Sequence, residues 1–470
     1  MKTTALALLA RAVALSCALL LLPLCTSAER PPFRCPPAES LGVCSCYETS
    51  STVQCEALDD ADDVSRSLAN KFEGPIPYLK LANGAFTSLN AGFLANVSVE
   101  RLYISTSLLE EVSPNAFSGS PGLGLMMLTN NRLREVPSEA LKKLTRLQTL
   151  IMLGNRISRL NGSSLARLGN LKFLSLYSNR IEYIEPGVFS PRLEHLSLAK
   201  NNLTSFNGAI RNLGSLEWLF VDSNQIESLA GELEGLVSLT VLNLEDNKLT
   251  SLEGSFKDLR SLKRLNLANN WIEYIGDAFA PLRHLLLLNL SKNHLATLEP
   301  QAFANLTQLQ LLDLSGNFLT EIGPALNHLK HLKKLNLSRN SLASVRLDEI
   351  KWLKELEELD LSRNQITTVD GTFGHYLSRI RKLNLSDNLL KRIHNGMHYL
   401  HDLTELDLSY NSVSSLDKRD LAKNKRLGRI DMQGNAWKCD ASLVRAIQEL
   451  YTRMVQVIGR PQCYLEPEDI

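Results

Sequence analysis

The segment LKFLSLYSNRI, residues 171–181, has leucines at its first, fourth and sixth positions, asparagine at its ninth and isoleucine at its eleventh. Successive side chains of a strand point to opposite faces, so Leu174 and Leu176 share one face while Phe173 and Ser175 share the other. A strand this short cannot bury its leucine face alone. The segment therefore predicts one unit of a larger stack.

The same pattern, L-x-x-L-x-L-x-x-N-x-L, recurs along most of the chain, for example as LQTLIMLGNRI (147–157), LKRLNLANNWI (262–272), LQLLDLSGNFL (309–319) and LEELDLSRNQI (356–366). Two degenerate copies, IPYLKLANGAF (76–86) and VERLYISTSLL (99–109), have Gly84 and Ser107 at the asparagine position. The pattern predicts about sixteen repeats over residues 71–435. The asparagine returns every 22 to 24 residues, at positions 131, 155, 179, 201, 224, 247, 270, 293, 317, 340, 364, 388, 411 and 435.

Stacked units of this kind bury their leucines in a continuous core and pair their strands in one parallel sheet. The asparagine amide has two donor hydrogens and an acceptor oxygen, so it can satisfy turn backbone groups that would otherwise be buried unpaired. Gly84 cannot do this and Ser107 can do it only in part, so we expect the first turns to rest on the adjacent cysteine-rich segment. A second apolar set follows each asparagine and includes a phenylalanine, such as Phe303, which we expect to fill the outer side of each turn.

The pattern resembles the leucine-rich repeat, and the resemblance covers nearly the whole chain. It implies an α/β fold: a right-handed solenoid with a curved parallel β-sheet on its concave face and a disulfide cap at each end. Secreted extracellular members of this type include the Slit and Toll ectodomains, the small leucine-rich proteoglycans and the acid-labile subunit of a growth-factor carrier complex. The resemblance implies adhesion, development, matrix organisation or innate immune recognition.

The first 28 residues predict a secretory signal peptide, with Lys2 at its start, an apolar run over residues 12–24 and small residues before Glu29. The formal net charge of +1 becomes −1 once Lys2 and Arg11 leave with this leader. A near-neutral balance gives no electrostatic reason to expect nucleic acid. No later segment is long and apolar enough for a transmembrane helix, so we expect a secreted, extracellular protein.

The cysteines outside the leader form two groups, which we assign to an N-terminal cap with an acidic linker (29–70) and a C-terminal cap (436–470): Cys35, Cys44, Cys46 and Cys55, then Cys439 and Cys463. An oxidising compartment favours disulfides over the alternative of zinc for the first group. Its four cysteines allow three connectivities. The family pattern implies Cys35 with Cys46 and Cys44 with Cys55. At the other end, NAWKCDASLVRAI resembles the family's C-terminal cap, with Ala441 at its second cysteine position, which leaves Cys463 for Cys439.

No phosphate-binding glycine loop, nucleophile elbow or HExxH motif is present, so the sequence predicts neither an enzyme nor a cofactor. Two weaker patterns are typical of solvent-exposed surface, but each also has a functional interpretation. The first, His394, His398 and His401, has the spacing of metal ligands on one helix face, although we expect no metal site. The second is the basic run at residues 417–429, which could contact a glycosaminoglycan or a membrane surface: Lys418, Arg419, Lys423, Lys425, Arg426 and Arg429.

Seven N-x-S/T sequons predict N-glycosylation: Asn96, Asn161, Asn202, Asn289, Asn305, Asn336 and Asn384. Three of these, Asn289, Asn336 and Asn384, lie in the string LNLS, where the asparagine faces outward on the strand. Glycans there would stand on the concave sheet. The same string also arises from the repeat pattern itself, so occupancy is open.

The outward strand positions differ between the two halves of the chain. Later repeats have polar pairs such as Lys334 with Asn336, whereas repeats one to eight carry mostly apolar and aromatic residues: Tyr78, Tyr103, Leu125, Met127, Ile151, Leu153, Phe173, Tyr177, His195, Trp218, Phe220 and Val241. Exposed apolar clusters mark interaction sites, and Trp and Tyr are favoured anchors of protein interfaces. We expect the partner surface at Tyr78, Tyr103, Met127, Ile151, Phe173, Tyr177, His195, Trp218 and Phe220.

The sequence thus predicts non-catalytic recognition of an extracellular protein through the N-terminal half of the concave face. Mutual shielding of the apolar residues, cover by a loop, a second copy of the chain and a small hydrophobic ligand remain alternatives for this surface. The alternative function is that of a structural extracellular-matrix protein, which would bind glycosaminoglycan or matrix partners through the basic run.

Overall fold

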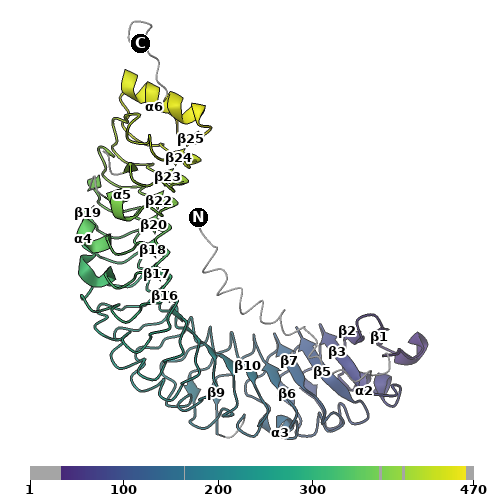
Figure 1. Cartoon of the computed structure of the whole chain (residues 1–470). Helices are drawn as coiled ribbons and strands as arrows, with labels where there is room; N and C mark the ends of the chain where they lie inside the picture. Colours follow the sequence, from purple (N-terminus) through teal and green to yellow (C-terminus); the bar gives the residue numbers. More distant parts are fainter. Residues whose placement is uncertain (1–32, 163–164, 370–372, 394–396, 462–470) are drawn as a thin grey trace.

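The leucines of the repeat build one sheet on the inner side of an arc-shaped solenoid (Figure 1). The computed structural model describes residues 33–162, 165–369, 373–393 and 397–461, and within these ranges the sheet has 19 strands. Each repeat strand pairs in parallel with the strands of the turns before and after it, so that Leu174 lies between Leu150 and Leu196. The parallel-sheet solenoid predicted from the repeat is confirmed.

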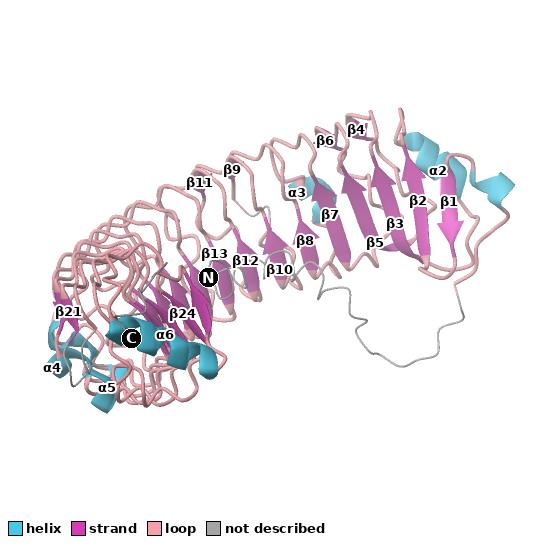
Figure 2. Ribbon diagram, turned by 90° about the horizontal axis from the view of Figure 1, so that it is seen from above, coloured by secondary structure: helices cyan, strands magenta, loops and turns pink. Residues whose placement is uncertain are grey.

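The repeat strands run in sequence order across the sheet, and Figure 2 shows them side by side along one face. They are β3 (Ile76–Ala82), β5 (Val99–Ser105), β7 (Leu125–Thr129), β8 (Thr149–Ile151), β10 (Phe173–Ser175), β12 (His195–Ser197), β13 (Trp218–Phe220), β14 (Val241–Asn243), β15 (Arg264–Asn266), β16 (Leu287–Asn289), β17 (Leu311–Asp313), β18 (Lys334–Asn336), β20 (Glu358–Asp360), β22 (Lys382–Asn384), β23 (Glu405–Asp407) and β24 (Arg429–Asp431).

The asparagine of each regular turn ties that turn to the preceding one. The Asn155 amide donates to the carbonyl oxygens of Leu128 in the preceding turn (2.7 Å) and Met152 in its own turn (3.0 Å). Its Oδ1 accepts from the backbone N–H of Leu133 at 3.2 Å. These bonds satisfy buried backbone groups between the strand and the following turn. Where Ser107 replaces the asparagine, its hydroxyl still accepts from the Gly84 N–H at 3.1 Å.

The outer side of the solenoid is made of loops with little regular structure. Behind these loops, buried phenylalanines of successive turns stack on one another. The ring centroids are 5.9 Å apart for Phe256 and Phe279 and 6.2 Å apart for Phe279 and Phe303. The regular elements here are short: β4 (Ser88–Leu89), β6 (Glu111–Val112), β9 (Arg159–Leu160), β11 (Tyr183–Ile184), β19 (Ser344–Val345), β21 (Thr368–Val369), α3 (Ser138–Leu141), η2 (Gly323–Leu326), α4 (Leu347–Ile350) and α5 (Phe373–Tyr376).

The N-terminal cap covers the first turn as predicted. A 3₁₀ turn, η1 (Ala38–Leu41), precedes the antiparallel hairpin of β1 (Cys44–Tyr47) and β2 (Thr52–Glu56), and β2 pairs in parallel with β3. Disulfides join Cys35 to Cys46 and Cys44 to Cys55, which confirms the pairing implied by the family resemblance and excludes zinc at these cysteines.

The acidic segment after the cap is more ordered than the expected linker. It leads into α2 (Asp62–Leu68), whose first turn contains Asp62 and Asp63 and whose Val64 and Leu68 are buried. The Asp60 carboxylate accepts from the Asp62 N–H at 3.0 Å. Negative side chains are favourable at a helix N-terminus because its free N–H groups carry partial positive charge, so the acidic residues begin a helix here.

The C-terminal cap closes the other end with α6 (Ala441–Thr452) and β25 (Gln456–Ile458), which pairs with β24. The Asp440 carboxylate accepts from the Leu443 N–H at 2.8 Å and so caps the helix. Cys439 is disulfide-bonded, and Cys463, its expected partner, lies outside the described residues, as does the predicted leader. No helix in the described ranges is both long and apolar enough to span a membrane.

Candidate functional site

The concave face presents two rows of outward side chains, because two positions of each strand point away from the core. Row one continues through facing residues of neighbouring strands as Tyr78, Arg101, Leu125, Thr149, Phe173, His195, Trp218, Val241, Arg264, Leu287, Leu311, Lys334, Glu358, Lys382, Glu405 and Arg429. Row two contains Lys80, Tyr103, Met127, Ile151, Ser175, Ser197, Phe220, Asn243, Asn266, Asn289, Asp313, Asn336, Asp360, Asn384, Asp407 and Asp431.

The predicted partner residues form two clusters in these rows. The tyrosine cluster consists of Tyr78, Tyr103, Met127 and Ile151 on β3 to β8. Its two tyrosine rings stack with centroids 6.2 Å apart. The Arg101 guanidinium lies 4.6 Å from the centre of the Tyr78 ring and donates to the Tyr78 hydroxyl. Burial raises the pKa of Tyr103 although Arg101 opposes the shift, so this hydroxyl is protonated at neutral pH.

The second group, here called the aromatic cluster, consists of Phe173, His195, Trp218 and Phe220 on β10, β12 and β13. Three of its rings are in contact across neighbouring strands: the His195 ring lies 5.8 Å from Phe173 and 4.4 Å from Trp218, the latter edge to face. These are favourable separations for aromatic pairs. Burial lowers the pKa of His195 against the opposing effect of Glu217 and Glu194. A neutral imidazole at neutral pH makes the cluster continuous and uncharged.

Shielding by neighbours reduces the exposed area of this surface. Ile151 is 2% exposed and Phe220 is 7% exposed, although both point to the concave side as predicted. The other seven predicted partner residues are partly exposed. Ser175 and Ser197 separate Ile151 from Phe220 in row two, so the two clusters meet there only through small side chains.

Tyr177 lies at the turn beyond row two, and charged side chains of the following turns lie near it. The Lys200 ammonium lies 5.3 Å from the centre of the Tyr177 ring. Asp222 occupies the position equivalent to Tyr177 two turns later. Burial raises the pKa of Asp222 to about 6, its own backbone N–H and Lys200 act against the shift, and Glu245 adds to it.

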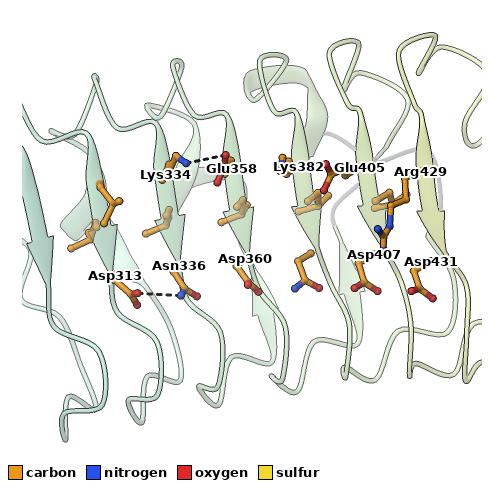
Figure 3. Close-up of a pocket in the computed structure, with 17 residues that line it drawn as sticks. Asp313, Lys334, Asn336, Glu358, Asp360, Lys382, Glu405, Asp407, Arg429 and Asp431 are labelled. Atoms are coloured by element: carbon orange, nitrogen blue, oxygen red, sulfur yellow. Dashed lines mark hydrogen bonds and ion pairs between the residues drawn. The ribbon is translucent and has the colours of Figure 1, made fainter. Parts of the chain in front are cut away.

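The C-terminal half of the concave face has a different character. Seventeen residues from β17 to β24 line a groove of about 400 Å³, shown in Figure 3. Row one alternates in charge here, with ion pairs between Lys334 and Glu358 (3.0 Å) and between Lys382 and Glu405 (3.1 Å). Surface ion pairs of this kind contribute about 0–1 kcal/mol each. The row-one charges of the groove from Lys334 to Glu405 are thus already paired.

Row two of this half consists of aspartates and asparagines that brace their own turns. The Asp360 Oδ1 accepts from the Ser362 N–H (2.9 Å) and hydroxyl (2.7 Å), and Asn384 Oδ1 accepts from the Ser386 N–H (3.0 Å) and hydroxyl (2.8 Å). An Asp or Asn side chain that binds the backbone two residues later is a common turn device. The strings LDLS and LNLS therefore have a structural role irrespective of glycosylation.

The sequons fall into three classes of exposure. Asn96, Asn161, Asn202 and Asn305 are exposed on turns, and Asn336 and Asn384 are partly exposed on the concave sheet. Asn289 is 2% exposed. A glycan on Asn289 would require this side chain to leave its buried position, so we predict that glycopeptide mapping finds Asn289 unmodified and the exposed sites occupied.

The weaker patterns do not converge on a site. His398 is partly exposed and His401 is exposed, while His394 lies outside the described residues. No group of three or more His, Cys, Asp or Glu residues in the described ranges is arranged to hold a metal. In the basic run, Arg419 pairs with Asp417 at 3.1 Å and Arg426 with Asp402 at 2.7 Å. Arg429 belongs to the concave sheet, so the run does not form a single surface.

The structure also exposes an aromatic row that the sequence reasoning missed. Trp271 and Phe318 are 49% and 56% exposed, and each lies directly after the asparagine of its repeat. His294 occupies the same position between them, and its ring lies 5.8 Å from that of Phe318. The signal was available, because this position is polar in most repeats and aromatic in these three.

The comparison with family models decides the classification of the chain. The leucine-rich repeat model matches residues 121–181, 170–226, 230–272, 275–319, 315–366, 330–390, 354–400 and 378–436, together more than half of the chain. The chain belongs to the leucine-rich repeat family. A search of curated proteins returned no match.

Solved leucine-rich repeat structures share this fold. A leucine-rich repeat protein of Leptospira interrogans has 24% identity and a TM-score of 0.65, covering 84% of this chain and 91% of its own. The Drosophila Toll–Spatzle complex gives 20% identity and a TM-score of 0.68, over 93% and 71%. The TLR13–ssRNA13 complex gives 18% and 0.60, over 89% and 79%. Identities this low support the fold alone.

Proposed function

We propose that this leucine-rich repeat protein is secreted and recognises an extracellular protein through the N-terminal half of its concave face. The contact surface comprises the tyrosine cluster, the aromatic cluster and Tyr177. The proposed role is binding without catalysis, in the setting of adhesion, development or innate immunity.

The observation that carries this proposal is the ring contact from Phe173 through His195 to Trp218. These side chains are not needed for the repeat, because the core of the same strands is filled by Leu174, Leu196 and Leu219, which are almost completely buried. At about 4.8 Å between strands, the rings of three neighbouring repeats form a rigid apolar strip. Rigid aromatic residues are enriched among the side chains that dominate protein interfaces.

A protein partner fits this surface better than the alternatives. Toll is solved with Spatzle and TLR13 with single-stranded RNA, so related solenoids differ in ligand class. Nucleic-acid sites depend on basic side chains for affinity. The aromatic cluster is flanked by Glu194, Glu217 and Asp222, and Lys172 beside it is paired with Glu194 at 2.6 Å. The matrix alternative, with glycosaminoglycan binding at residues 417–429, has less support because Arg419 and Arg426 are paired with aspartates.

The experiment compares two tryptophans that are both accessible in the folded chain. Native extracellular fluid is passed over the immobilised chain, and the bound proteins are quantified for the parent, Trp218→Ala and Trp271→Ala. We expect a partner whose affinity falls about 30-fold with Trp218→Ala, since loss of a central interface aromatic costs about 2 kcal/mol. Trp271→Ala is the matched control, because Trp271 lies on a turn outside both concave rows.

Two further arms test the ligand class. Single-stranded RNA and heparin are each titrated against the same three proteins over a salt gradient. Equal retention of every bound protein by all three chains would contradict the proposal. Saturable RNA or heparin binding that is lost with Trp218→Ala would replace the protein partner by that ligand.

A further inference from the structure

Two carboxylates stand side by side at the edge of the aromatic cluster. Asp222 lies two residues beyond Phe220, on the same side of the chain, and Glu245 has the equivalent position in the next turn. The two turns are joined by the bond from the Ser223 N–H to the Glu245 carbonyl oxygen, at 2.9 Å. The two carboxylates therefore form an acidic border beyond row two, next to the aromatic side chains of the cluster.

Each carboxylate is held in place by one amide. The Asn243 side chain donates to Asp222 Oδ1 and the Asn266 side chain donates to Glu245 Oε2, both at 2.9 Å. Among the described residues, no other side chain donates a hydrogen bond to either carboxylate. The pair is thus positioned by the sheet and has acceptor capacity left for a ligand.

The free protein holds this pair at an electrostatic cost. Burial raises the pKa of Asp222 to about 6, and Glu245 and Asp246 in the following turn act in the same direction. Lys200 in the preceding turn opposes them, but its ammonium also faces the Tyr177 ring. A cation from a partner would relieve the repulsion between Asp222 and Glu245.

A buried hydroxyl next to the cluster also has no partner. Ser197 faces Phe220 across the sheet in row two, and its Oγ is buried with no hydrogen bond. Buried hydroxyls are normally hydrogen-bonded. Ser197 therefore leaves an unsatisfied polar group beside Phe220, at the aromatic end of the proposed site.

We propose that the partner presents a basic side chain, arginine or lysine, next to an apolar one. The apolar side chain packs on Trp218 and Phe220, and the cation binds between Asp222 and Glu245. This inference rests on the proposed function and specifies its partner. Phe220 and Asp222 are two residues apart on one face, roughly 7 Å along the strand. Alternate side chains of an extended partner segment have the same spacing, so an apolar-x-basic sequence fits.

Arginine fits these groups best for chemical reasons. Its planar guanidinium can donate two bonds at once to a carboxylate and can also stack on an aromatic ring. Trp218 provides such a ring in the same turn as Asp222, and Asp222 and Glu245 provide the acceptors. Charge complementarity thus favours a partner segment that contains a basic side chain over a purely apolar segment.

The test uses random peptides displayed on phage and panned on the immobilised full-length chain at neutral pH. Affinities of the enriched peptides are then measured against Trp218→Ala, against the double variant Asp222→Asn with Glu245→Gln, and against a control double variant, Asp360→Asn with Glu405→Gln. Both double variants remove two negative charges from the concave face. All four substitutions keep a carbonyl oxygen that can accept the existing hydrogen bonds.

We expect enriched peptides that contain Arg or Lys near an apolar residue. Their binding should weaken about 10-fold or more in the Asp222/Glu245 variant, as for loss of a charged hydrogen bond, and stay unchanged in the control. Peptides that lack basic residues but depend on Trp218 would overturn this inference and leave the proposed function standing. Failure to enrich peptides, or enrichment of peptides that bind Trp218→Ala equally well, would count against both.

Discussion

The two halves of the concave face share one backbone and differ in their outward side chains. From β3 to β13 the rows carry mostly rings and aliphatic chains, interrupted by Lys80, Arg101, Thr149, Ser175 and Ser197, and from β17 to β24 they carry mostly charges and turn-bracing Asp and Asn side chains. In both halves the inward leucines are buried to the same extent. The comparison shows that stacking of the repeats fixes the inward residues and leaves the outward ones free for function.

The C-terminal half shows what this sheet looks like when its surface groups have partners within the chain. Lys334 and Lys382 are bound to glutamates of the next strand, and Asp360 and Asn384 are bound to the serines two residues later. In the N-terminal half, Trp218 has ring contacts only, and Ser197 Oγ has no hydrogen bond. We therefore place the proposed recognition surface on the N-terminal half.

The largest expected effect is on the scaffold, and it should be the same in both halves. Asn247 in the N-terminal half and Asn388 in the C-terminal half each make four bonds to backbone groups of two adjacent turns. Substitution by alanine leaves these buried groups unpaired, so we expect each variant to lose about 3 kcal/mol of unfolding free energy. Urea unfolding measures this, and a clear difference between the two variants would break the claim of a common scaffold.

A second effect should depend on pH. The folded-state pKa of Asp222 is about 6, above the ordinary value of 3.8, so the folded chain binds this proton more tightly than the unfolded chain. Protonation of Asp222 stabilises the folded chain fully below about pH 4, and this stabilisation is lost as the pH rises through about 6. Ionised Asp222 therefore destabilises the fold by up to about 3 kcal/mol at neutral pH, at about 1.36 kcal/mol per pKa unit.

Asp222→Asn should accordingly stabilise the chain at neutral pH and have no effect below about pH 4. Thermal unfolding across this pH range provides the measurement. Asp360→Asn is the control in the other half, because the Asp360 carboxylate already accepts two bonds from Ser362. A stability difference for Asp222→Asn that does not change with pH would show that its ionisation is not the cause.

The smallest effect is expected for the charges of the C-terminal groove. Removing the pair with Lys334→Ala and Glu358→Ala should change the unfolding free energy by less than about 1 kcal/mol, since exposed ion pairs contribute little. It should also leave partner affinity unchanged. Calorimetry measures the unfolding free energy, and a binding titration measures the partner affinity. A loss of affinity comparable to that of Trp218→Ala would extend the recognition surface into this half.

The sequence predicted the solenoid because its leucines and asparagines repeat with a fixed period and a single buried role. It also placed Phe173, His195 and Trp218 on the concave side, because successive side chains of a strand point to opposite faces of the sheet. It could not show that Phe220 and Ile151 are buried by their neighbours. That depends on how side chains of three adjacent strands lean over one another, which no single repeat encodes.

Other features depended on contacts between turns. The LNLS string suggested glycosylation, whereas the bond from the Ser386 N–H to Asn384 Oδ1 shows a structural role. The acidic stretch before the first repeat was expected to be a linker, but packing of Val64 and Leu68 makes its last part a helix. The proximity of Asp222 and Glu245 likewise follows only from the register of neighbouring turns.

The central claim is that recognition takes place on the N-terminal half of the concave face. Hydroxyl-radical footprinting of the chain, alone and bound to the partner recovered from extracellular fluid, tests it directly. We expect reduced oxidation of Trp218, Phe173 and Tyr177 on binding and unchanged oxidation of Trp271 and Phe318. Protection confined to residues of β17–β24 or to the outer turns, with Trp218 as reactive as in the free chain, would contradict it.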